Sequence, residues 1–123
     1  MANPNIVAVT SIYGSTSYLI PSTTGATAWT ALTPASGTVN RINNIVASNV
    51  TSAAVAVTVS INSATGGGGT AYRLAYQISV PANASLIIVD KTTAFYLGES
   101  QSVVVTVATG SALELTSSFE AIT

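Results

Sequence analysis

Apolar and polar residues alternate along much of this chain with a period of two, which is typical of half-buried β-strands. The segment Val55–Ile61 has valine or isoleucine at every second position, with small or polar residues between them. The segments Tyr72–Val80 and Leu113–Ile122 alternate in the same way. We expect each of the three to be a strand with one face in a core. The predicted core face of the second segment consists of Tyr72, Leu74, Tyr76, Ile78 and Val80.

Shorter apolar runs, bounded by turn residues, predict further strands. These runs are Ile6–Ile12, Ser17–Ile20, Ala26–Leu32, Val39–Val50, Leu86–Val89 and Val103–Val107. Within Val39–Val50, the residues Ile42, Ile45 and Ala47 share a face only if one extra residue intervenes near Asn43–Asn44. This spacing predicts a β-bulge at the two asparagines.

The pattern as a whole predicts an all-β protein. No stretch of about ten residues keeps the apolar spacing of an amphipathic helix. About 8–10 short strands at regular spacing indicate a single-domain antiparallel β-sandwich, of jelly-roll or immunoglobulin-like (Ig-like) type. We expect residues 1–5 to form an extended N-terminal arm and residues 6–123 to form the sandwich. Gly66–Gly69 predicts a flexible loop and not a phosphate-binding loop, because a strand follows the glycines where such a loop requires a helix.

Charged residues are scarce in this sequence. The 123 residues include three Lys or Arg and four Asp or Glu, which is 6%, where an ordinary globular protein has about 25%. Three basic residues cannot release enough counterions for nucleic-acid binding, so no nucleic-acid partner is expected. No apolar run approaches the roughly 20 residues of a membrane-spanning helix, and the N-terminus lacks the features of a signal peptide. We therefore expect no membrane association.

The candidate chemistry is equally sparse. Histidine and cysteine are absent, which removes the commonest general base, the commonest metal ligand and every thiolate. Lys91 adjoins Asp90, and we expect an ion pair in a turn and not a catalytic base. Glu114 and Glu120 lie six residues apart on one predicted strand, roughly 20 Å at about 3.3 Å per residue. That separation is too long for two-carboxylate glycoside hydrolysis, so we expect no enzymatic activity, no cofactor and no metal site.

A surface with so few charges favours contact with other protein chains, because electrostatic repulsion against self-association is weak. Abundant Ser, Thr and Asn residues could instead keep a neutral monomer soluble. Trp29 and Tyr18 are candidate interface side chains, and Trp is enriched at binding hot spots. Trp29 could equally be a core residue, and if exposed the two aromatics could form a carbohydrate platform. In the arm, Asn3, Pro4 and Asn5 are predicted to contact another chain.

The last third of the chain contains strand and turn motifs in a characteristic order. These motifs are Pro81, Leu86–Val89, Asp90-Lys91, Tyr96-Leu97, Ser102–Val107 and Phe119-Glu120. Their order resembles that of small β-sandwich virion proteins of tailed bacteriophages, which include capsid decoration (cement), neck and tail proteins. The segment Val39–Val50 resembles the "V-x-x-I-x-x-I-x-V-x-N" part of the same proteins. The turn at 98–101 departs from the family pattern, because Gly-Glu-Ser-Gln stands where Glu-Gly-Asp is usual.

The resemblance implies a virion structural protein that has no catalytic residues. Its first implication is a capsid decoration protein, which binds the major capsid protein as a homo-oligomer, with a trimer favoured, and stabilises the outer capsid surface. A neck, tail or fibre-associated protein that binds other virion proteins is the alternative within the same class. A carbohydrate-binding module on a fibre is the alternative of a different class.

Deletion of residues 1–5 should weaken association with the particle and leave the domain folded, because the arm is predicted to contact another chain. Co-sedimentation of the truncated protein with particles measures the association, and circular dichroism monitors the fold. Undiminished association after the deletion would count against the arm.

Overall fold

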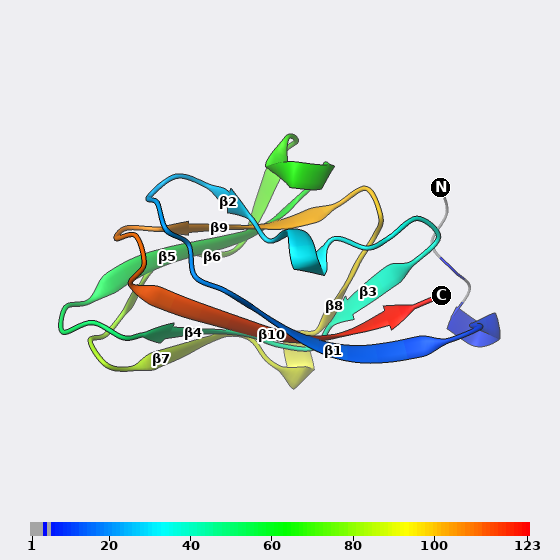
Figure 1. Ribbon diagram of the computed structural model, residues 1–123, viewed down its shortest axis with the longest axis horizontal. Helices are drawn as coiled ribbons and strands as arrows, with labels where there is room; N and C mark the ends of the chain where they lie inside the picture. Colours follow the sequence, from blue (N-terminus) through cyan, green and yellow to red (C-terminus); the bar gives the residue numbers. More distant parts are fainter. Residues whose placement is uncertain (1–3, 5) are drawn as a thin grey trace.

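The computed structural model describes residue 4 and residues 6–123, and its regular elements are almost all strands (Figure 1). The strands are β1 (Ile12–Leu19), β2 (Thr27–Ala28), β3 (Val39–Ile42), β4 (Ile45–Asn49), β5 (Val55–Asn62), β6 (Ala71–Val80), β7 (Ser85–Val89), β8 (Phe95–Leu97), β9 (Ser102–Val107) and β10 (Leu113–Ile122). Four short 3-10 turns lie between them: η1 (Ile6–Ala8), η2 (Thr30–Leu32), η3 (Thr65–Gly67) and η4 (Lys91–Thr93). The predicted all-β class is therefore confirmed.

The strands form two antiparallel sheets that face each other. In the first, sheet A, β10 pairs with β1 along one edge and with β4 and β3 in succession along the other. The strands β7 and β8 continue the sheet beyond β4 and β3. The second, sheet B, has the order β2-β9-β5-β6. Figure 1 shows sheet B above sheet A, with β9 and β5 facing β10 and β4.

The strand order is that of a jelly roll. If β3 and β4 count as one interrupted strand, and β7 and β8 as another, each sheet has four positions. The chain crosses from sheet A to sheet B between β1 and β2 and returns for β3. An Ig-like sandwich would instead keep its first two strands in one sheet. The predicted β-sandwich is thus confirmed, and its topology is that of the jelly roll and not of the Ig-like fold.

Two asparagines interrupt the strand that the sequence predicts over Val39–Val50. Asn43 donates its backbone N–H to the Ser118 carbonyl at 2.9 Å, and Asn44 Oδ1 accepts the Ser118 N–H at 2.9 Å. These contacts replace the regular ladder at the break between β3 and β4. Ile42, Ile45 and Ala47 are all buried in the core. The extra residue that keeps these side chains on one face was predicted, and it is present.

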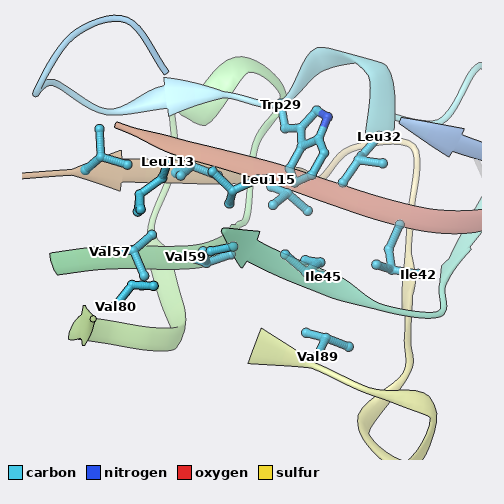
Figure 2. Close-up of a cluster of buried hydrophobic side chains, with 14 of the residues drawn as sticks. Trp29, Leu32, Ile42, Ile45, Val57, Val59, Val80, Val89, Leu113 and Leu115 are labelled. Carbon is cyan, nitrogen blue, oxygen red and sulfur yellow. The ribbon is translucent and has the colours of Figure 1, made fainter. Parts of the chain in front are cut away.

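Inward-facing side chains of both sheets make one hydrophobic core (Figure 2). Sheet B supplies the three valines of β5 and those of β9, and sheet A supplies Leu113, Leu115 and the isoleucines of β3 and β4. Trp29, which directly precedes η2, and Leu32, its last residue, lie at one end of the cluster. Close packing of this kind makes every lost methylene costly.

Two predicted strands near the N-terminus are wrong. Residues 6–8 of the predicted strand Ile6–Ile12 form η1, and the strand begins only at Ile12 and continues to Leu19. In Ala26–Leu32, two residues pair with β9 and the rest turns into η2. The Trp29 N–H donates to the Val103 carbonyl at 2.8 Å, and the chain then leaves the sheet. In the first segment Val7 and Ala8 of η1 are exposed, whereas in the second Leu32 of η2 is buried in the core. Residue type alone cannot distinguish such short turns from a strand.

The predicted burial of the core face of β6 is wrong for four of its five residues, and β6 does not alternate regularly. Val57 pairs with Ile78, Val59 with Ala75 and Ser60 with Arg73. Thr58 of β5 therefore faces two residues of β6, Tyr76 and Gln77. Leu74 is a second extra residue of β6, between the partners of Val59 and Ser60. Two bulges follow from this register, and they break the period of two. Of the five predicted core residues, Val80 is buried, and Tyr72, Leu74, Tyr76 and Ile78 are exposed.

The glycine-rich loop after β5 lies on the outer face of sheet B. Asn62 Oδ1 accepts the N–H groups of Ala64 and Gly69 at 3.0 and 2.8 Å. Gly67, which has a φ of 77°, donates its N–H to Ser102 Oγ at 3.1 Å. The Ser102 hydroxyl in turn donates to the Ala64 carbonyl at 2.7 Å. The sequence predicts that this loop is flexible. In the structure these hydrogen bonds hold it in a defined conformation.

Leu115→Ala should lower the free energy of unfolding by about 2–5 kcal/mol, because the truncation leaves a cavity between the two sheets. Urea unfolding measures the change as a lower midpoint at an unchanged m-value. The control is Val50→Ala at an exposed position after β4, which should change stability by no more than about 0.5 kcal/mol. Equal effects of the two substitutions would contradict the described core.

Candidate functional site

An ion pair lies on the outer face of sheet A. Arg41 and Glu120 are register partners, and their Nη1 and Oε1 atoms are 4.0 Å apart. Asn43 also donates to Glu120 Oε1, at 3.1 Å. Both charged side chains are partly exposed, and pairs of this kind contribute about 0–1 kcal/mol. The pair therefore matters less for stability than for neutralising two of the few charges on this face.

Asp90 caps η4 and does not form an ion pair. Its Oδ1 accepts the N–H groups of Thr92 and Thr93 at 2.9 and 3.2 Å, and Thr93 Oγ1 accepts the Asp90 N–H at 3.0 Å. This reciprocal arrangement is a capping box. Hydrogen bonds from Thr92, and then from Thr93, hold the pKa of Asp90 below its usual value. Among the described residues, no ion pair joins Asp90 to Lys91, so the predicted turn ion pair is wrong.

The other carboxylates do not gather into a site. Glu99 Oε2 accepts the N–H of Gly37, in the loop before β3, at 2.7 Å. Glu114 is exposed on the outer face of sheet A, opposite Ser48. In the part of the chain that the structure describes, no three or more His, Cys, Asp or Glu side chains come together as a metal site would require. The expectations of no cofactor and no enzymatic activity stay predictions.

Trp29 is a core residue and not an exposed interface anchor. Its side chain is 1% exposed, and its Nε1–H donates to Ser17 Oγ at 3.1 Å. The bond crosses from sheet B to β1 and satisfies the polar atom of the indole. Because the ring has no exposed face, the prediction of Trp29 as an interface residue or part of a carbohydrate platform is wrong. Trp29 instead joins the two sheets.

Tyr18 lies on the outer face of sheet A and is 79% exposed. The register places it in a row with Thr116, Val46 and Ile87 across β1, β10, β4 and β7. This row has no charge, and Tyr18 and Ile87 stand at its two ends. Of the predicted arm contacts, Pro4 is partly buried, and Asn3 and Asn5 lie outside the described residues.

A second group of exposed apolar residues lies where the sandwich ends at β6. Tyr72, Leu74 and Ile78 are 63%, 38% and 43% exposed. We call these three residues the β6 margin. Tyr72 and Ile78 pair with Ile61 and Val57, so they are on the core side of sheet B. The hydrophobic core therefore continues without interruption to solvent at this side of the molecule.

The sequence pattern does not reveal the β6 margin, because an edge strand and a central strand have the same apolar pattern. The residues Arg73 and Gln77, which alternate with the apolar ones, were read as the solvent face. What exposes the β6 margin is the position of β6 at the end of sheet B, where it pairs with β5 alone. Strand order is a tertiary property, and no local signal marks it.

Comparison with known proteins does not assign a family. No protein-family model matches the chain, and no curated protein is significantly similar to it in sequence. Among the described residues, no helix has the length and apolar character needed to cross a membrane.

Asp90→Ala should lower the melting temperature near neutral pH, because the ionised carboxylate holds the cap of η4. The folded-state pKa is lowered, so this stabilisation is present above the unfolded value, about 3.9, and is lost as the pH falls through the folded pKa. Thermal unfolding across a pH series should show the wild type and the variant converge in acid. The control, Glu114→Ala, should show no convergence, and a difference for Asp90→Ala that does not depend on pH would contradict the cap.

Proposed function

We propose that this protein is a non-enzymatic structural subunit of a bacteriophage particle, and specifically a decoration protein of the outer capsid surface. The observation that carries the proposal is the β6 margin, an apolar surface continuous with the core. Contiguous apolar patches on a protein surface often mark sites of contact with another molecule. The resemblance of the C-terminal motifs to virion proteins supplies the kind of assembly.

The remaining surface supports packing against other subunits. The outer face of sheet A has small hydroxyl side chains at its centre, where Thr16 and Ser118 are in contact, and Ser48 and Ser85 share a hydrogen bond of 2.8 Å. Small side chains let a partner approach the sheet closely. The paired Arg41 and Glu120 add little net charge. A face of this kind suits neutral contacts with the major capsid protein and with further copies of the chain, in a homo-oligomer for which a trimer is favoured.

Two other functions follow from the same features. A neck, tail or fibre-associated protein would use the same surfaces at another place in the particle. In a carbohydrate-binding module on a fibre, Trp29 could not contact a sugar because it is buried. The exposed aromatic residue available for such a contact is Tyr18, which lies beside Thr116. Copy number separates the first alternative from decoration, and glycan binding that Tyr18→Ala abolishes would support the second.

Electron microscopy of native particles should show density for the jelly roll on the outer capsid in copies that number in the hundreds. A decoration protein follows the symmetry of the capsid lattice, whereas a neck or tail protein follows the low symmetry of a ring. A ring of a few copies would move the protein to the neck or tail. Particles without this density would contradict the virion assignment.

The β6 margin can be tested in the same particles. Tyr72→Ser combined with Ile78→Ser should reduce incorporation, because both side chains would lose an apolar partner surface. The matched control is Tyr13→Ser, which removes an exposed tyrosine from the opposite sheet edge, on β1. Circular dichroism verifies that each variant folds. Incorporation of the double variant at the level of the control would show that the β6 margin is not the interface.

A further inference from the structure

A trough of about 400 Å³ crosses the outer face of sheet B, on the side of the sheet opposite the core. Its lining comes from the central strands β5 and β9, from the turn after β9, from the segment before β2 and from β6. The lining residues are Thr24, Ala56, Thr58, Gln77, Thr106, Val107 and Ala108. This volume is within the range of small-molecule sites.

The floor is a pair of threonines. Thr58 on β5 is directly opposite Thr106 on β9, so their hydroxyls face the trough side by side. Thr24, before β2, and Gln77, on β6, add a third hydroxyl and an amide from opposite sides. The lining therefore offers several neutral hydrogen-bond donors and acceptors and has no charged side chain. A neutral ligand rich in hydroxyl groups matches this chemistry.

A strained bulge brings Gln77 to the trough. Tyr76 and Gln77 together occupy the place opposite Thr58, because Ala75 pairs with Val59 and Ile78 with Val57. Gln77 has a φ of 50°, which is unfavourable for a residue with a side chain. Its N–H donates to Thr58 Oγ1 at 2.9 Å, and this bond holds the bulge against the floor. Bulges that redirect a side chain occur often beside binding sites.

The other residue of the bulge is an exposed aromatic. Tyr76 is 57% exposed, and the guanidinium carbon of Arg73 lies 5.3 Å from the centre of its ring. This cation–π contact restrains the ring next to Gln77 in the chain. Tyr76 does not itself line the trough, but it directly precedes the lining residue Gln77. An aromatic ring at this position would add a flat apolar surface to the hydrogen-bonding groups of the trough. The two together suit a pyranose, which has an apolar C–H face and a rim of hydroxyls.

We propose that this trough binds a neutral saccharide, with Tyr76 against a sugar face and Gln77, Thr58 and Thr106 on its hydroxyls. The Gln77 amide, which can donate and accept, sets the orientation of the sugar. The site is distinct from the β6 margin, and it does not rest on the proposed place of the protein in a virion. It also differs in position from the Tyr18 surface, which is on the other sheet.

Titration of the isotope-labelled full chain, followed by NMR, tests the proposal. The probes are maltotriose, cellotriose, mannotriose and tri-N-acetylchitotriose, each added to about 10 mM because an open trough is expected to bind at a Kd on the order of 1 mM. At least one probe should shift the amide signals of Thr58, Gln77 and Thr106. If none shifts them, or if the shifts centre on Tyr18, the proposal is overturned.

Three variants define the contacts. Tyr76→Ala and Thr106→Val should each weaken binding by about tenfold or more, a typical effect of losing one good contact. Gln77→Gly should raise the melting temperature, because glycine adopts a positive φ without strain. The same substitution should weaken binding. If Gln77 serves only the turn, binding would be unchanged. The control is Thr116→Val, an exposed threonine on sheet A, and it should bind as the wild type does. Wild-type affinity in the three trough variants would overturn the assignment.

Discussion

The backbone ladder of β10 is the constraint on which the rest of the structure depends. This strand bonds to β1 along one edge and to β4 and then β3 along the other, so it orders most of sheet A. Its inward leucines, Leu113 and Leu115, meet the valines of sheet B in the core. The break at Asn43–Asn44 lies opposite Ser118 of β10, and the two asparagines bond to that residue. The kink in the neighbouring strand is thus held to β10 as well.

The two proposed activities of the surface have a common origin in the low charge of the chain. With few charged side chains to place, the outer faces are built from Thr, Ser and Gln, and exposed tyrosines provide most of the aromatic surface. The bulges of β6 separate these faces. They leave Tyr72 and Ile78 beside the core, and they place Gln77 over the outer trough. One irregular edge strand therefore provides two different contact surfaces.

Much of the fold could be predicted from sequence, and the errors have a physical reason. The alternation of Val55–Ile61 predicted β5 correctly, because β5 has a partner on each side and its inward face is fixed by both. The extra residue at Asn43–Asn44 was likewise visible, since it alone keeps Ile42 and Ile45 together. The edge strand β6 has one partner, so bulges cost it little and its pattern misled the prediction. Of the candidate site residues, Trp29 is buried and Tyr18 is exposed. This difference could not be predicted from the sequence, because it depends on which elements of the fold cover each ring.

The central place of β10 has a consequence for synthesis of the chain. Ile12 pairs with Ile122 and Leu19 with Leu115, so β1 finds its partner β10 only when all the strands between them have been made. Until then β1 and the β3–β4 edge remain open, and contacts so distant in sequence form slowly. Sheet A can therefore form only after β10 has been made, and removal of β10 would cost the sheet its middle and not merely its margin.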